Sequence, residues 1–286
     1  MLTYKFAILI ISHGRPDNIP TITALKKSNY SGDYYIIIDD EDKTSEKYLT
    51  NYPGHVIIFC KQNYINSNSL LFNTELRSVA VHARNAAENI AKELNLDYYI
   101  LLDDDITNFH YRYVDDKLHS DKLDNIDSAF NAYIKYMSDT NISTIGLAHD
   151  GMFLGGNTQA FNAPQHSRNR ILANAFIRNM KYDVQWGPDM CEDFITSINE
   201  NNKANIWITL PFIGIHCKKQ GMKKSKSDGG NSEAYLMGGN YGVAKYAVLA
   251  HPDCYELSSN LWFRCVSYDT IVPKIISCKY KVGDYL

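Results

Sequence analysis

The sequence lacks any hydrophobic run of the ~18 residues that a membrane-spanning helix needs. Residues 1–11 contain one Lys and no small-residue cleavage pattern, which predicts a first strand rather than a signal peptide. The formal net charge of −3 excludes a wholly basic surface for nucleic acid but allows a local basic patch. The six Cys residues show no C-x-x-C spacing, which favours reduced thiols in a cytoplasmic protein, in the host cytoplasm if the chain is viral.

Two common nucleotide-binding motifs are also missing. No glycine-rich dinucleotide fingerprint and no P-loop follows the first predicted strand, which argues against a dehydrogenase or a P-loop NTPase. A zinc site formed by Cys191, Cys217 and His216 is conceivable, although structural zinc ligands usually come in close pairs. There is no internal repeat and no Pro/Ser linker, so we treat residues 1–286 as a single domain.

The most informative stretch runs from Tyr98 to Asp105. Five bulky residues that favour strands lead directly into three Asp residues, Asp103, Asp104 and Asp105. A short apolar run of this kind predicts a buried strand of a parallel sheet. Because unpaired carboxylates are too costly to bury, the strand must end where the acids begin. That end is where open α/β sheets bind ligands, and clustered carboxylates suit a divalent cation that also holds a substrate phosphate. A solvated acidic loop is the alternative.

The first half of the chain alternates predicted strands and helices. We expect strands over 5–12, 34–38, 55–60 and 98–102, and helices over 18–28, 43–49 and 74–94. This alternation predicts right-handed crossovers and a mainly parallel sheet. Ser12, Arg15, Asp39, Asp40 and the acidic triplet would then lie along one edge of it.

The second half is less regular. An amphipathic helix is expected over 124–139 and strands over 144–148 and 205–216. Residues 171–182 suit a strand or a short helix, and the segment from Trp186 leads into a helix that ends near Asn201. A basic loop spans 218–227, Gly229 and Gly230 follow it, and a helix is expected near 241–250.

The order of these features resembles the GT-A glycosyltransferases. The matching features are the acidic pair Asp39-Asp40, Arg84-Asn85 on the helix before the acidic triplet, Glu192-Asp193 at a helix start, and His216 after a strand. The segment 191–194 followed by 223–232 and Tyr235 is similar to the TET/JBP-associated glycosyltransferases of phages and some eukaryotes, which are thought to glycosylate hydroxymethylated pyrimidines in DNA. The resemblance implies an α/β, Rossmann-type, mostly parallel central sheet flanked by helices, with an irregular C-terminal acceptor side. Residues 1–110 would bind the nucleotide sugar and 111–286 would carry the acceptor and catalytic side.

The resemblance also implies roles for particular residues. Asp105 and His216 would bind a divalent Mn²⁺ or Mg²⁺ ion, which would neutralise the diphosphate leaving group of a nucleotide-sugar donor, expected to be a UDP-sugar. Asp193 matches the catalytic base, and Glu192 beside it could take that role instead. The other expected donor contacts are Ser12, Arg15, Asp39, Asp40, Arg84, Asp103, Asp104, Lys226, Gly229 and Gly230.

Each role has a structural alternative. Arg84 could simply pair with Glu88 one helical turn later, and Asp193 could be an acid favoured by the helix dipole. Surface loops would explain Arg15, Asp39 and the lysines, and a lone His such as His216 is often structural. Arg168, Arg170, Trp186, Lys223 and Lys224 could contact a DNA acceptor and an extruded base, whereas a packing role suits Trp186 as well.

Other functions fit parts of the pattern. A GT-A enzyme could act on a glycan, lipid or protein. The sequence predicts no membrane partner. A sugar nucleotidyltransferase would usually carry a longer Gly-rich basic loop than the turn at 12–16. Two further alternatives are a non-catalytic binding module and a two-metal nuclease that uses the acids. A nuclease would degrade DNA with metal alone, whereas a transferase would consume a nucleotide sugar.

Overall fold

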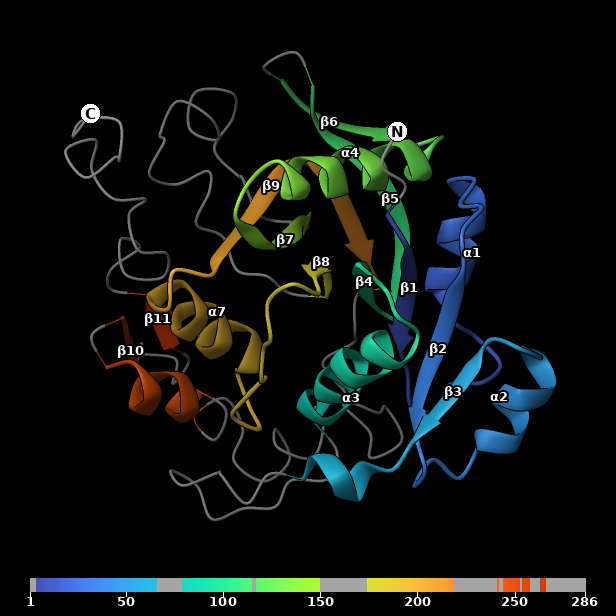
Figure 1. Ribbon diagram of the computed structural model, residues 1–286, viewed down its shortest axis with the longest axis horizontal. Coiled ribbons are helices and arrows are strands. Elements are labelled where there is room, and N and C mark those ends of the chain that lie inside the picture. Colours follow the sequence, from blue (N-terminus) through green and yellow to red (C-terminus); the bar gives the residue numbers. More distant parts are fainter. Residues whose placement is uncertain are drawn as a thin grey trace.

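The computed structural model describes residues 4–65, 79–114, 117–149, 174–218, 241, 244–252, 254–257 and 263–265. The first half alternates strands and helices as predicted (Figure 1). Its elements are β1 (Phe6–Ile11), α1 (Pro20–Lys27), β2 (Tyr34–Asp39), α2 (Ser45–Asn51), β3 (Val56–Phe59), the 3-10 helix η1 (Lys61–Tyr64), α3 (Ala80–Glu93) and β4 (Tyr98–Asp103). The expected helix over 74–94 is therefore confirmed from Ala80 onward, and its first residues lie outside the described ranges.

The second half adds a hairpin that the sequence did not predict. Two strands, β5 (Ile106–Val114) and β6 (Lys117–Lys122), pair directly after the acidic triplet. The elements that follow were expected: α4 (Ile126–Ser138), β7 (Ile142–His149), β8 (Ala175–Asn179), α7 (Glu192–Asn202) and β9 (Ile206–Cys217). Residues 244–250 are helical, and β10 (Tyr255–Leu257) pairs with β11 (Phe263–Cys265).

The described strands form a nine-stranded sheet in the order β3-β2-β1-β4-β8-β7-β9-β5-β6. The predicted class, an α/β protein with a central sheet flanked by helices, is confirmed. The pairs among β1 to β4 are parallel, as expected for strands joined by crossover helices. The sheet becomes mixed beyond β4, because β8 runs antiparallel to both β4 and β7 and the β5 strand runs antiparallel to β9. β7 and β9 pair in parallel again, so the second half mixes parallel and antiparallel pairs whereas the pairs among β1 to β4 are all parallel.

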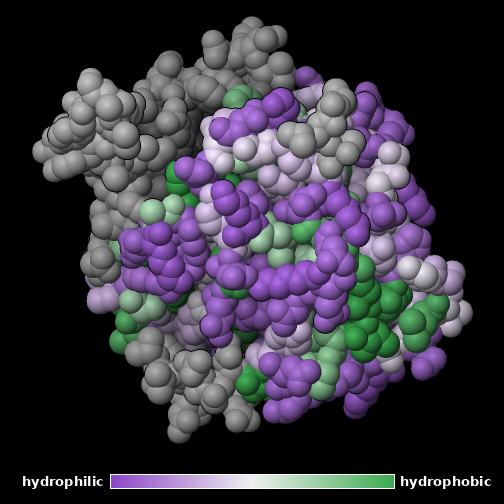
Figure 2. Space-filling model, viewed as in Figure 1, coloured by the Kyte–Doolittle hydropathy of each residue, from purple (hydrophilic) through white to green (hydrophobic). Residues whose placement is uncertain are grey.

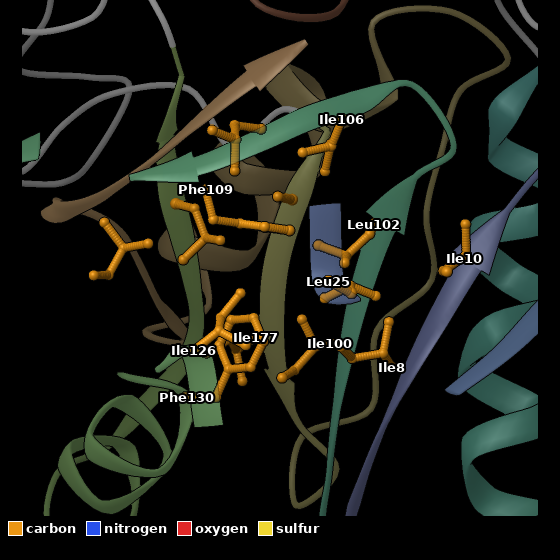
Figure 3. Packing of buried hydrophobic residues seen from close by; sticks show 14 of the residues in the cluster. Ile8, Ile10, Leu25, Ile100, Leu102, Ile106, Phe109, Ile126, Phe130 and Ile177 are labelled. Carbon is orange, nitrogen blue, oxygen red and sulfur yellow. The ribbon is translucent and has the colours of Figure 1, made fainter. Parts of the chain in front are cut away.

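Alternating residues of the strands supply two separate cores. Leu9 of β1 packs with α3 and α7 on one face, whereas its neighbours Ile8 and Ile10 pack with α1 and α4 on the other. Figure 3 shows part of the second core, where Phe130 of α4 lies among residues from β4, β5 and β8. Because both faces are covered, the central strands read as continuous apolar runs. In β1, β2 and β4 the polar residues are left at the strand ends.

The surface carries few hydrophobic residues on the face drawn in Figure 2. They gather there over α2 and β3, where Leu49 and Ile58 are exposed. None of the helices in the described ranges combines the length and the hydrophobicity needed to cross a lipid bilayer.

Candidate active site

The ends of β1 and β4 lie side by side, because Ile11 pairs with Asp103 in parallel register. The turn after β1 binds the second acid of the triplet. Ser12 Oγ donates a hydrogen bond of 2.6 Å to Asp104 Oδ2, and Arg15 Nη1 contacts Asp104 Oδ1 at 2.7 Å. Burial raises the pKa of Asp104, although Arg15 and Ser12 oppose the shift. These three residues, all expected to contact the donor, are therefore brought together by the fold.

A second charged cluster lies at the ends of β2 and β3. Asp39 contacts His13 Nδ1 through one oxygen at 2.8 Å and Lys61 Nζ through the other at 2.7 Å. Burial alone would raise the pKa of Asp39, but the hydrogen bonds from His13 and Lys61 outweigh it and bring that pKa to about 2. Asp40 is exposed, and its carboxylate accepts a hydrogen bond of 2.9 Å from the Lys61 backbone N–H. The expected acidic pair thus shares one lysine.

Arg84 lies on α3 with 4% of its surface exposed. Its guanidinium contacts Glu192 Oε1 at 3.0 Å, not Glu88, so the pairing within the helix that the sequence allowed is wrong. Glu88 instead binds Arg178 Nε at 2.9 Å. The Arg84 guanidinium also lies 5.3 Å from the ring centre of Trp186, which adds a cation–π contact. Arg84 Nη1 makes the contact with Glu192, whereas Arg84 Nε has no hydrogen-bond partner within the described part of the chain.

The acids of α7 begin immediately after a strained residue. Cys191 has a positive φ of 57°, which a residue with a side chain adopts at a cost. This conformation turns the chain into α7, so that Glu192 and Asp193 occupy its first turn. Glu192 is buried against Arg84, whereas Asp193 is partly exposed and its Oδ1 accepts a hydrogen bond from Phe194 N at 3.0 Å. Of the two acids, Asp193 is the better placed to meet a substrate.

The charges of β4 and α7 interact strongly. Burial raises the pKa of Asp103 to about 8, helped by Asp105, Asp104 and Glu192 and opposed by Arg84. Burial and the neighbouring Glu192 raise the pKa of Asp193 to about 7, again against Arg84. A base that acts in neutral solution needs a pKa in this range. We call Arg84, Asp103, Asp105, Glu192 and Asp193 the acidic centre.

The two expected metal ligands lie on neighbouring elements. Lys218 N, which follows β9, donates to the backbone oxygen of Asp105 at 2.9 Å, and Thr107 Oγ1 donates to the backbone oxygen of His216 at 2.9 Å. Within the described ranges, no group of three or more His, Cys, Asp or Glu side chains is arranged to hold a metal ion. The donor set still fits Mg²⁺ or Mn²⁺, because such ions are usually held by one or two carboxylates together with substrate phosphates and water.

The remaining expected contacts divide into two groups. Trp186 is fully buried between Phe176 and Trp207, with ring centres 4.9 and 5.2 Å away, which favours the packing role over contact with an acceptor. The others lie outside the described residues: Arg168, Arg170, Lys223, Lys224, Lys226, Gly229 and Gly230.

Sequence reasoning missed several residues of this edge. His13 and Lys61 hold Asp39, and Tyr48 OH contacts Ser12 Oγ at 2.8 Å. Lys61 was within reach of prediction, because it follows the third parallel strand and must lie at the same edge as the first two. Tyr48 gave no such signal, since a tyrosine inside an amphipathic helix usually marks packing alone.

The family model of the TET-associated glycosyltransferases matches residues 6–227 of this chain. Among solved structures, glucosyl-3-phosphoglycerate synthase from Mycobacterium tuberculosis in complex with Mn²⁺, UDP-glucose and phosphoglyceric acid is similar, with a TM-score of 0.50 and 7% identity over 92% of this chain and 86% of that one. TarS from S. aureus in complex with UDP-GlcNAc is also similar, with a TM-score of 0.48 and 12% identity over 86% of this chain and 66% of that one.

No curated protein matches the sequence significantly. At such low identity the similarity to the synthase shows the fold, and that fold is of the GT-A glycosyltransferase type. The family match covers well over half of the chain and includes every described residue of the acidic centre. The chain therefore belongs to the TET-associated glycosyltransferase family and is a glycosyltransferase.

Proposed function

We propose that this enzyme transfers a sugar from a UDP-sugar to the hydroxyl group of a 5-hydroxymethylpyrimidine in DNA, with the help of a divalent Mg²⁺ or Mn²⁺ ion. The observation that carries the proposal is the meeting of Asp103, Glu192 and Asp193 around Arg84 at the end of β4. The family description supports a DNA acceptor, and the synthase with UDP-glucose and Mn²⁺ supports the donor and the metal.

In this proposal the donor binds along the ends of β1, β2 and β3. The preformed contacts of Asp39 and Asp104 give that edge fixed polar groups for a nucleotide. Asp105 and His216 would hold the ion, which would stabilise the charge that develops on the diphosphate leaving group. Arg84 keeps a positive charge beside the reacting region, because its pKa is raised by Glu192, Asp193 and Asp103 in spite of burial.

Asp193 is the proposed base. Attack of an acceptor hydroxyl on the anomeric carbon requires loss of the hydroxyl proton as the new bond forms. A pKa of about 7 allows Asp193 to accept that proton in neutral solution. Glu192 is buried and already holds Arg84, so its role is to fix the guanidinium. We assign donor binding to residues 1–110 and the acceptor side to 111–286 of a single domain, with Arg168, Arg170 and the lysines at 218–226 as acceptor or diphosphate contacts.

The test is mass spectrometry of duplex DNA that contains hydroxymethylated pyrimidines, incubated with the protein, Mg²⁺ or Mn²⁺ and a panel of UDP-sugars. We expect one added sugar per modified nucleoside, and no addition to unmodified DNA of the same sequence. Consumption of a UDP-sugar without any change in the DNA would reject the DNA acceptor and point to a glycan, lipid or protein. Cleavage of the DNA by protein and metal alone would reject glycosyl transfer altogether.

A further inference from the structure

Two side chains bind the backbone of Trp186 and Gly187, which lie a few residues before the first turn of α7. Asn85 of α3 uses both ends of its amide: its Oδ1 accepts from Trp186 N at 2.8 Å and its Nδ2 donates to Trp186 O at 2.9 Å. Thr196 of α7 does the same for the next residue. Its hydroxyl accepts from Gly187 N at 3.2 Å and donates to Gly187 O at 3.1 Å. Two side chains thus satisfy the backbone donor and acceptor of two successive residues.

These contacts join two helices that no short connection holds together. Asn85 lies one position after Arg84 on α3, and Thr196 lies three positions after Asp193 on α7. Residues three apart on a helix lie on the same side of it, so the contact at Thr196 fixes the turn that carries Asp193. The path from Asn85 through Trp186 and Gly187 to Thr196 is uncharged. It runs beside the charged contact between Arg84 and Glu192.

The uncharged hydrogen bonds of Asn85 and Thr196 do not depend on the protonation of nearby groups, whereas the Arg84–Glu192 ion pair does. The Arg84–Glu192 contact lies among carboxylates whose charges will change when a donor, a metal or a proton arrives. Amide and hydroxyl hydrogen bonds keep their strength through such changes, because neither group titrates in the working range. The backbone groups of Trp186 and Gly187 would be costly to leave unsatisfied in this partly buried place, which further fixes the geometry.

We propose that Asn85 and Thr196 are positioning residues which, through the backbone of Trp186 and Gly187, hold Asp193 at a set distance from the acids of β4. The proposal rests on the proposed role of Asp193 as the base. Displacement of a reacting group by about 1 Å can lower a rate by about 100-fold. Loss of either side chain should therefore lower the rate of transfer while the donor edge, on β1 to β3, stays intact.

The test uses the variants Asn85→Leu and Thr196→Val, which remove the hydrogen bonds at nearly constant size. We expect kcat to fall by about 10- to 100-fold, while calorimetry with UDP gives the wild-type stoichiometry and a Kd within about threefold of the wild-type value. Thr196→Ser keeps the hydroxyl and should restore most of the rate. Asn89→Leu removes an amide one turn further along α3 that donates to Tyr64 OH at 3.1 Å, away from Trp186 and Gly187, and it should leave kcat near the wild-type value.

Two further measurements separate positioning from a general loss of structure. In an Asp193→Asn background, Asn85→Leu should lower the residual rate no further, because the group it positions is already disabled. In crystals of Thr196→Val, the distance between the Cα atoms of Asp193 and Asp103 should differ from that of the wild type. An unchanged kcat and distance, or a kcat loss matched by a loss of UDP-binding sites, would overturn the proposal. If the wild-type protein turns over no sugar donor, the proposed function fails. The distance between the Cα atoms of Asp193 and Asp103 in crystals of Thr196→Val would still test whether Thr196 positions Asp193.

Discussion

Two charged regions share one edge of the sheet, and they differ in how their charges are balanced. At the ends of β2 and β3, Asp39 is held between His13 and Lys61, and Asp104 nearby is held by Arg15. In the acidic centre, Glu192 contacts the guanidinium of Arg84, and the charges of Asp103 and Asp193 act on the same guanidinium. The first region has a cationic or hydrogen-bonding partner for each acid named. The second is crowded with negative charge.

The difference appears in the pKa values. The pKa of Asp39 is lowered to about 2, so its ionised form stabilises the fold. Burial raises the pKa of Asp104 in spite of Arg15 and Ser12, so the contrast in pKa rests on Asp39. The pKa of Asp103 is raised to about 8 and that of Asp193 to about 7, so their ionised forms are disfavoured in the folded protein. A balanced cluster is suited to binding without rearrangement, whereas a crowded one gains from an added proton or cation. We therefore assign donor binding to the region around Asp39 and the chemical step to the acidic centre.

The largest expected effect is on Asp193. Asp193→Asn should lower kcat by about 100- to 10,000-fold, the usual contribution of a general base, while UDP affinity by calorimetry stays unchanged. Glu192→Gln is the matched control, since it removes the neighbouring charge and should retain a larger share of the rate. A dead Glu192→Gln beside an active Asp193→Asn would mean that the two roles are reversed.

Asp105 comes next. Asp105→Asn, or removal of metal with a chelator, should lower the rate by at least about 100-fold, because several kcal/mol of leaving-group stabilisation would be lost. The fold should stay intact, which circular dichroism can check. Full activity in chelator would remove the metal from the mechanism.

The two arginines should differ in their effect on stability. Arg84→Met leaves Glu192 buried without its partner, which should lower the free energy of unfolding by about 3 kcal/mol in metal-free buffer. Arg15→Met should cost about 1 kcal/mol, because its side chain is 29% exposed and water can replace it. Urea denaturation of both variants measures the difference. Equal losses would contradict the contrast between the two regions.

The stabilities of variants at Asp39 and Asp103 should depend on pH in opposite ways. Asp39→Asn should destabilise the protein by about 2 kcal/mol at pH 7, and the loss should shrink as the pH falls from 4 towards 2, where the wild-type carboxylate takes up its proton. Asp103→Asn should instead stabilise the metal-free protein, increasingly as the pH rises from 4 to 8, because the ionised wild-type Asp103 is disfavoured when folded. Urea denaturation across this range tests both signs. Changes of the same sign in the free energy of unfolding of both variants would show that the acidic centre does not hold an excess of negative charge.

The smallest effect concerns the acceptor. If DNA binds the loop at 218–226, replacing Lys223 and Lys224 with Ala should flatten the salt dependence of DNA affinity by up to about two log–log units, at about 0.9 per phosphate contact. Lys26 and Lys27, exposed at the end of α1, form the control pair and should leave the slope unchanged. A loss of UDP-sugar affinity with an unchanged DNA slope would assign the loop to the donor diphosphate.

Much of the fold followed from strong local signals. The apolar runs of β1, β2 and β4 end in polar residues, so their place in the sheet and the position of their acids could be predicted. The β5–β6 hairpin could not, because its strands mix polar and aromatic residues without clear alternation. The antiparallel insertion of β8 between β4 and β7 was also missed, since pairing between distant strands leaves little trace in local sequence.

The site was predictable in its residue types but not in its pairings. Asp103, Glu192 and Asp193 were identified from their places at element ends. The partner of Arg84 was not, because Glu88 lies in helical register and Glu192 is more than a hundred residues away. Long-range contacts of this kind are decided by the packing of α3 against α7, which only the folded chain reveals.

The most direct test of the account is the location of a bound cation. Crystals of the wild-type protein grown with UDP and Mn²⁺ can be measured for anomalous scattering from manganese. We expect a single strong peak in the acidic centre, coordinated by Asp105. A peak at Asp39, between His13 and Lys61, or no peak while UDP is bound, would contradict this assignment.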